Sequence, residues 1–242
     1  MTPTTSYLIC GTPRAGTSLL AGLLHGTGIA GRPEEYFWKE NEAARSARWR
    51  ARDYGAYVRA VMNEATTANG VFGATIMWGY MDDVLAKLAA ASRNESLRGH
   101  ALLCEWFPNL HYVWLTRHDR VAQAVSWSRA IQSRQWYKDD RRHGGDLPVA
   151  FKFDQIDHLV KEIDAHELAW STFFVRSGVA PLHVVYEALE HDMMPTIVSV
   201  LRFLGLDPTN VRIEPRSMRQ RDALNQEWTK EYNRLAAHQA DQ

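Results

Sequence analysis

Short apolar runs alternate along the chain with longer segments whose apolar side chains recur at helical spacing. Four runs have the length of a buried strand, and they cover residues 7–10, 71–78, 110–115 and 182–186. Parallel strands need long crossover connections, and a helix after each strand supplies one. The pattern therefore predicts an α/β fold, a doubly wound parallel sheet with helices on both faces, in a single domain over residues 1–242.

The same periodicity predicts the helices and the segments between them. We expect helices at residues 17–24, 82–91, 119–136, 154–176, 187–204 and 223–237. Pro195 should kink or split the fifth of these, and Gly205 suits the cap at its C-terminus. The polar stretch at about 135–150 predicts a mobile loop with the character of a lid, and residues 209–222 predict a basic loop.

The first strand leads into the sequence GTPRAGTS at residues 11–18, directly before a helix. Glycine lets the backbone turn so that N–H groups converge, and the helix N-terminus adds further donors for a phosphate. The ATP-binding pattern G-x-x-x-x-G-K-[ST] has a lysine for the β- and γ-phosphates, and Thr17 stands there. Since Arg14 is the only cation in the loop, we expect a site for one phosphate group. The alternative is a strand-to-helix turn that binds nothing.

A second candidate anion site follows the third strand. Arg117 lies at the carboxyl end of this strand, and Ser126 lies nine residues later on the next helix. Ligands of doubly wound sheets gather at the carboxyl ends of the strands, where the loop at residues 11–18 also lies. Two anion sites at one edge suggest a nucleotide with two separated phosphates. The alternative is that Arg117 forms a structural ion pair with Asp119 or Asp83.

Composition narrows the classes of partner. Lysine plus arginine and aspartate plus glutamate number 28 each, so no global field attracts nucleic acid or a membrane surface. The two cysteines, Cys10 and Cys104, predict neither a disulfide framework nor a Cys-rich zinc site, and they fit the cytoplasm. No run approaches the roughly 20 apolar residues of a membrane span. We find no spacing that predicts a metal site.

Several stretches carry a resemblance to a known family. Residues 13–20 resemble the 5′-phosphosulfate loop of sulfotransferases that use 3′-phosphoadenosine 5′-phosphosulfate (PAPS), and residues 117–126 resemble their 3′-phosphate motif. More narrowly, the chain is similar to the bacterial trehalose 2-sulfotransferase family. The similar stretches run in order along the chain, at residues 27–37, 70–73, 77–78, 123–127, 219–222 and 227–228. The resemblance implies the sulfotransferase fold and a homodimer.

The resemblance also implies roles for individual residues. The enzyme would move a sulfuryl group from PAPS, without a metal, to a hydroxyl of trehalose or a related sugar or glycolipid precursor. The implied general base is Glu35, in the pattern Pro-x-Glu, although the residues alone do not separate it from Glu34. Arg14 would stabilise charge on the 5′-phosphate. The implied donor-binding residues are Pro13, Arg14, Ala15, Gly16, Thr17 and Ser18 for the 5′-phosphosulfate, and Arg117 and Ser126 for the 3′-phosphate, with Arg219 or Arg221.

Aromatic and charged residues near these motifs are candidates for the acceptor site. Rings stack on the apolar faces of sugars, and those expected to do so are Tyr36, Phe37, Trp78 and Trp136, although core packing is the commoner role of each ring. We interpret the pairs Glu162–His166 and Asp154–His158 as solvated helix faces. We interpret the arginines at 45, 48, 52 and 59 in the same way.

One departure from the family pattern keeps other functions open. After Gly73 the family pattern has glycine or alanine and then a lysine, whereas this chain has Ala74 and Thr75. The missing cation would weaken stabilisation of the leaving group or change the acceptor. A non-catalytic nucleotide- or sugar-binding protein of the same fold is therefore one alternative. A P-loop nucleotide phosphotransferase is another, which Thr17 disfavours because that class needs a lysine at this position.

Overall fold

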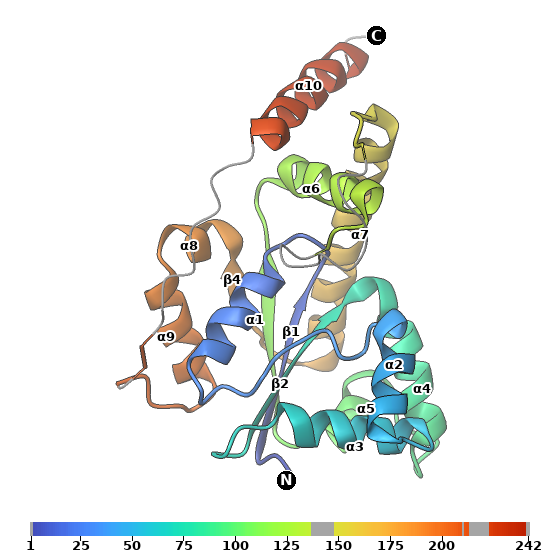
Figure 1. Ribbon diagram of the computed structural model, residues 1–242, viewed down its shortest axis with the longest axis vertical. Coiled ribbons are helices and arrows are strands. Elements are labelled where there is room, and N and C mark those ends of the chain that lie inside the picture. The colour runs from blue at the N-terminus through green and yellow to red at the C-terminus, as the bar shows by residue number, and fades with distance from the viewer. Residues whose placement is uncertain (1, 137–147, 210, 213–222, 241–242) are drawn as a thin grey trace.

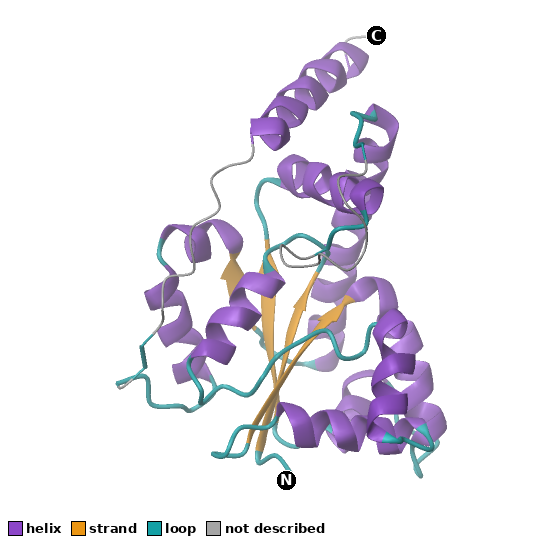
Figure 2. Ribbon diagram, viewed as in Figure 1, coloured by secondary structure: helices purple, strands orange, loops and turns teal. Residues whose placement is uncertain are grey.

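The central sheet is parallel, as the sequence predicts. The computed structural model describes residues 2–136, 148–209, 211–212 and 223–240. The strands point toward one end of the molecule, which is the top in Figures 1 and 2. Their order is β2-β1-β3-β4, and every neighbouring pair is parallel. The strands are β1 (Thr5–Gly11), β2 (Val71–Met77), β3 (Leu110–Thr116) and β4 (Leu182–Val185).

Helices cover both faces of the sheet and bury alternate strand residues. Ile9 and Val113 face the core under α1 (Thr17–Gly26), α8 (Tyr186–His191) and α9 (Met193–Phe203). Leu8 and Tyr112 face the other core. The helices over that face are α3 (Tyr54–Ala65), α4 (Met81–Ala91), α5 (Gly99–Trp106) and α7 (Phe153–Ser177). This alternation follows from the two-residue period of a strand, and it confirms the doubly wound arrangement.

A third apolar cluster lies beyond the carboxyl ends of the strands. Here α6 (Arg120–Ser133) packs against α7, and α10 (Ala223–Ala240) packs against both (Figure 1). The cluster includes Trp127, Ile163 and Trp228, each at least nine-tenths buried. Together the three helices form a wall next to the end of the sheet where the predicted phosphate loop lies.

The observed helices differ from the predicted ones in several places. The segment predicted as a helix over residues 187–204, kinked or split at Pro195, is split three residues earlier, at Asp192, into α8 and α9. Pro195 falls in the first turn of α9, where its missing N–H leaves no helical hydrogen bond unmade. Gly205 follows α9 with a φ of 72°, as expected for a helix end. The sequence pattern also did not predict α2 (Lys39–Trp49), α3 or α5; α2 has no buried side chain, and the eight residues of α5 include only two.

Other bounds are close to the predicted ones, or lie partly outside the described residues. Helix α6 begins at Arg120, after Asp119, whose carboxylate accepts from the N–H of Ala122 at 2.9 Å. Helix α2 (Lys39–Trp49) and the short 3₁₀ helix η1 (Trp78–Tyr80) complete the described elements. Much of the loop predicted at about 135–150 and of the basic loop at 209–222 lies outside the described residues.

The strand order changes direction between β1 and β3. The chain crosses from β1 to β2 on one side and later returns to place β3 on the other side of β1. The loops that follow β1 and β3 therefore leave the sheet in opposite directions, and doubly wound folds bind ligands in the crevice at such a point, outside the carboxyl ends of the strands. The loop that begins at Gly11 and the segment that begins at Arg117 meet there.

Arg120→Met should destabilise the protein, and the loss should depend on pH. Burial raises the pKa of Glu167, and Arg120 partly offsets this effect because its Nη2 lies 2.7 Å from the carboxylate. Without the guanidinium the pKa of Glu167 rises further, so the folded variant binds a proton that the unfolded chain releases at neutral pH. Urea unfolding should show a loss of about 1–3 kcal/mol at pH 7.5. The difference in free energy of unfolding between wild type and variant should decrease as the pH falls toward 5. A difference that does not change with pH would contradict this account.

Candidate functional site

The loop after β1 adopts a conformation that depends on glycine. Arg14 and Gly16 have positive φ angles, 66° and 104°. A Cβ on Gly16 would lie only 2.4 Å from Cδ2 of Tyr186, so a larger residue would clash with that ring as well as strain the backbone. The N–H of Ala15 donates to the carbonyl of Thr12 at 3.2 Å and closes the turn. The loop is therefore tightly folded onto α8.

The N-terminus of α1 opens at the end of this loop. Its N-cap residue is Gly16, which has no side chain to cap the helix. The first-turn N–H groups of a helix have no partner within the helix, so they suit an anion. Thr17 is buried at this position, whereas Ser18 is exposed. Ala15 is fully buried, so its part in the site is through the backbone.

Arg14 connects the loop to the wall formed by α6. Its Nε donates to Oγ of Ser126 at 3.0 Å, and its Nη1 donates to the carbonyl of Trp136 at 2.7 Å. Arg14 and Ser126 are 112 residues apart in the sequence. The structure thus brings together one residue from each of the two predicted anion motifs.

The Gln123 side chain is hydrogen-bonded to the loop after β1, a role that the sequence analysis missed. Its Nε2 donates to Oγ1 of Thr12 at 2.6 Å and to the carbonyl of Pro13 at 2.9 Å, and its side chain is fully buried. The indole N–H of Trp170 donates to the carbonyl of Gly11 at 2.9 Å. Gln123 lies in a stretch that carries the family resemblance, but a buried contact to another segment leaves no local sequence signal.

Arg117 lies beside the same crevice, and one of its N–H groups makes no hydrogen bond within the described part of the chain. Its guanidinium lies 4.7 Å from the centre of the Tyr186 ring, which itself packs on Gly16. Its Nε is buried and has no hydrogen-bond partner among the described residues. The predicted alternative, an ion pair with Asp119 or Asp83, is not formed. Asp119 caps α6, and Asp83 pairs with Lys87 at 2.6 Å.

A carboxylate fixes the backbone around Arg117. The Glu187 side chain accepts hydrogen bonds from the N–H groups of His118 at 3.1 Å and Asp119 at 3.2 Å. Burial raises the pKa of Glu187, but these two bonds and the nearby Arg117 outweigh burial and hold the pKa below its usual value. The turn after β3 is therefore tied to α8, which carries Tyr186 and Glu187.

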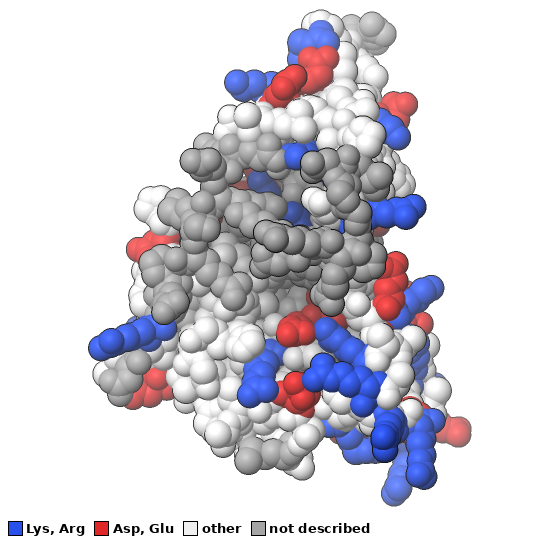
Figure 3. Space-filling model, viewed as in Figure 1, with Lys and Arg blue, Asp and Glu red and all other residues white. Residues whose placement is uncertain are grey.

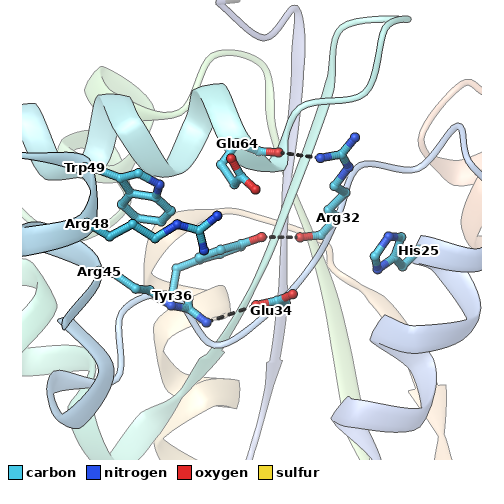
Figure 4. Close-up of a pocket in the computed structure, with 8 residues that line it drawn as sticks. All are labelled: His25, Arg32, Glu34, Tyr36, Arg45, Arg48, Trp49 and Glu64. Atoms are coloured by element: carbon cyan, nitrogen blue, oxygen red, sulfur yellow. Dashed lines mark hydrogen bonds and ion pairs between the residues drawn. The ribbon is translucent and has the colours of Figure 1, made fainter.

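The structure separates Glu34 from Glu35, which the sequence leaves equivalent. The carbonyl of Glu34 accepts from the N–H of Thr75 in β2 at 2.9 Å, and its carboxylate forms an ion pair with Arg45 at 2.9 Å (Figure 4). The Arg45 guanidinium also lies over the ring of Tyr36, 4.6 Å from its centre. Glu34 is exposed and already paired, whereas Glu35 is half-buried.

The loop that carries Glu35 reaches the phosphate loop through two indole rings. Trp38 packs edge-on against Trp136, with 6.0 Å between the ring centres. The carbonyl of Trp136 is the one that accepts from Arg14. Glu35 precedes Trp38 by three residues, so the candidate base lies in a loop that is packed against the candidate anion site.

The rings predicted to bind the acceptor differ in exposure. Phe37 is only 1% exposed and packs against Phe107, so it belongs to the core and we remove it from the acceptor site. Tyr36 is buried too, but its ring lines a surface pocket (Figure 4). Trp78 and Trp136 are half-buried, which leaves ring surface for a ligand.

The prediction of a solvated face is wrong for His166. Its side chain is 15% exposed and lies near Gly79 and the ring of Trp127. Burial lowers its pKa, and its Nδ1 is buried without a hydrogen-bond partner among the described residues. His158 is exposed, as expected.

Thr75, which replaces the expected lysine, is 2% exposed in β2.

Some predictions concern residues or groups that the structure does not place. Arg219 and Arg221 lie outside the described residues, so their expected role stays a prediction. Across the described part of the chain, no three His, Cys, Asp or Glu side chains gather as a metal site would require. None of the described helices is long and apolar enough to cross a membrane.

Comparisons with known proteins identify the family of this chain. The model of the Stf0 sulphotransferase family matches residues 6–235. The trehalose 2-sulfotransferase of Mycobacterium tuberculosis (strain ATCC 35801 / TMC 107 / Erdman) is 28% identical, over 93% of this chain and 93% of its own. The trehalose 2-sulfotransferase of Mycolicibacterium smegmatis is 28% identical, over 96% of each chain. A crystal structure of a sulfotransferase from Alicyclobacillus acidocaldarius has a TM-score of 0.51 at 16% identity, over 96% of this chain and 92% of its own, and it supports the fold.

Proposed function

Because this chain belongs to the Stf0 sulphotransferase family, we propose that it transfers the sulfuryl group of PAPS to a hydroxyl of a carbohydrate. The observation that carries the proposal is the meeting of two cationic motifs at one crevice. Arg14, in the loop after β1, donates a hydrogen bond to Ser126 on α6. The guanidinium of Arg117 lies over the ring of Tyr186, and its buried Nε has no partner among the described residues. A donor with phosphates at both the 5′ and the 3′ positions matches two separate anion sites.

The 5′-phosphosulfate is assigned to the loop and the N-terminus of α1. The N–H groups after Gly16 and the hydroxyls of Thr17 and Ser18 would hold the 5′-phosphate. Arg14 would stabilise the charge that grows on this phosphate as the bond to sulfur breaks. Thr17 in place of a lysine favours this donor over a nucleoside triphosphate with magnesium. Arg117 and Ser126 would hold the 3′-phosphate, with Arg219 or Arg221.

The transfer itself needs a base for the acceptor. Glu35 would take the proton of the acceptor hydroxyl while the oxygen forms a bond to sulfur. The bond between sulfur and the bridging oxygen of the 5′-phosphate breaks, and adenosine 3′,5′-bisphosphate leaves. Positioning and electrostatic stabilisation supply most of the rate in such in-line transfers, and no metal is required by this scheme.

The acceptor class rests on similarity and on the nearby rings. Trehalose is the acceptor in the names of the two 28%-identical relatives. Tyr36 is the neighbour of Glu35 in the chain, and Trp136 packs against Trp38 of the same loop. The expected homodimer and the cytoplasmic location stay predictions. The proposal is tested by incubating the protein with PAPS labelled in its sulfate and with a panel of sugars. It predicts labelled sugar and adenosine 3′,5′-bisphosphate in equal amounts, and it fails if the protein binds the nucleotide but labels no sugar.

A further inference from the structure

A surface pocket lies next to the loop that carries Glu35. It has a volume of about 320 Å³, and it opens between the C-terminal end of α1, helices α2 and α3, and the loop from α1 to α2 (Figure 4). This volume is at the low end for small-molecule sites, which suits one sugar ring or a similar group. The pocket is lined by His25, Arg32, Glu34, Tyr36, Arg45, Arg48, Trp49 and Glu64.

The lining has more positive than negative charge. It contains three arginines and two glutamates, whereas the whole chain has no net charge. Arg45 and Glu34 neutralise each other in their ion pair, and the Glu64 carboxylate offsets one of the other two arginines, which leaves one net positive charge. Arg32 bonds only to the backbone carbonyl of Glu64, at 3.4 Å, among the described residues. Arg48 forms no ion pair within the described part of the chain, and it points from α2 into the pocket (Figure 4).

Surrounding surface charge adds to this local field. Lys and Arg side chains gather on the face of the molecule near α2, at the lower right of Figure 3. Arg50 and Arg52, which follow α2, are both exposed. A concave site bordered by cations raises the local concentration of anionic ligands. The pocket is thus suited to a ligand that combines negative charge with groups for hydrogen bonding.

The pocket is also close to the proposed base along the backbone. Glu34 and Tyr36, both in the lining, are the immediate neighbours of Glu35. The carbonyl of Glu34 is anchored to Thr75, and the phenol of Tyr36 donates to the carbonyl of Arg32 at 2.8 Å. Both neighbours of Glu35 are therefore fixed by contacts next to the pocket. The pocket borders the segment that carries the proposed base, although the Glu35 side chain is not itself part of the lining.

We infer that this pocket is a subsite for an anionic group of the acceptor, so that the preferred acceptor is an acidic carbohydrate with a phosphate or carboxylate. The inference rests on the proposed function. Arg48 and Arg32 present guanidinium groups, which match the oxygens of both anions in a two-point contact. The rings of Tyr36 and Trp49 give the subsite apolar walls for the sugar that bears the anion.

The test compares acceptors that differ only in charge. Trehalose is compared with trehalose 6-phosphate, and glucose with glucuronate, by steady-state sulfuryl transfer. We expect kcat/KM to be at least about tenfold higher for one acidic member than for its neutral partner, as one charge-assisted contact provides. The two pairs distinguish a phosphate site from a carboxylate site. Equal values within both pairs would overturn the inference.

Arg48→Ala separates the pocket from the general surface charge. The variant should lose most of the preference for the acidic acceptor while the neutral acceptor is sulfated at the wild-type rate. Arg52→Ala is the matched control, because it removes the same charge from an exposed position that does not line the pocket. Arg48 is itself exposed, so both variants should fold. Equal losses in the two variants would contradict a specific subsite.

Binding without turnover keeps this inference distinct from the proposed function. Calorimetric titration with trehalose 6-phosphate and with glucuronate is done on protein saturated with adenosine 3′,5′-bisphosphate, so that neither ligand can occupy the donor site. Binding of either ligand that weakens about tenfold or more in Arg48→Ala supports the subsite even if no sugar is sulfated. Sulfuryl transfer to neutral sugars, with no effect of Arg48→Ala on either binding or transfer, supports the proposed function and rejects the subsite.

Discussion

Glu35→Gln should lower the rate of sulfuryl transfer by about 10²–10⁴-fold, the usual contribution of a general base. The substitution keeps the shape of the side chain and one acceptor oxygen, but it removes the basicity. Affinity for adenosine 3′,5′-bisphosphate should stay near the wild-type value, because the proposal assigns the anion sites to Arg14, Arg117 and their neighbours. Transfer of labelled sulfate and calorimetric titration measure the two effects separately.

Glu34→Gln is the matched control for this prediction. Glu34 is the adjacent carboxylate, but it is exposed and paired with Arg45. Its loss should remove that ion pair, and surface pairs contribute little to stability. Because Glu34 and Arg45 line the pocket, the control is measured with a neutral acceptor, for which a small effect on the transfer rate is expected. Similar small effects at both positions would contradict the assignment of Glu35 as the general base. Glu35 would then be interpreted as a carboxylate without a catalytic role.

Arg117→Ala should weaken binding of adenosine 3′,5′-bisphosphate by about 10- to 150-fold. A charge-assisted contact to phosphate contributes on the order of 1.5–3 kcal/mol, which corresponds to this range. Adenosine 5′-monophosphate lacks the 3′-phosphate, so its affinity should change much less. Calorimetric titration with both nucleotides measures the difference.

The comparison between nucleotides is the control for indirect damage by this substitution. Arg117 packs over Tyr186, which contacts Gly16, so a displaced ring could disturb the loop that is assigned to the 5′-phosphate. Such damage would weaken both nucleotides equally. Equal losses would therefore rule out a role in binding the 3′-phosphate.

The sequence predicts the features that depend on local pattern. Each strand is a short apolar run, and the alternation of strands and helices leads to the parallel sheet that is observed. The loop at residues 11–18 is recognisable because Gly16 needs a conformation that few other residues adopt, with a φ of 104°. The position of Arg117 at a strand end follows from the same local reasoning.

Features that depend on distant contacts were not predictable from the chain. The bond from Arg14 to Ser126 joins residues 112 apart, and the buried contacts of Gln123 to the loop have no local signature. Glu34 and Glu35 look alike in sequence, and the folded chain is needed to show that Glu34 is exposed while Glu35 is half-buried. His166 was expected on a solvated face because helical spacing gives no information about what packs against α7. Arg48 is exposed, as expected for a solvated face, although it lines a surface pocket, whereas Arg45 is half-buried and pairs with Glu34.

The most direct test of the account is a crystal structure of the protein with adenosine 3′,5′-bisphosphate. The account predicts the 5′-phosphate against the N-terminus of α1, with Arg14 within hydrogen-bond distance. It predicts the 3′-phosphate on Arg117 and Ser126, across the crevice between β1 and β3. Density for the 3′-phosphate away from Arg117, or for the whole nucleotide outside this crevice, would contradict the account.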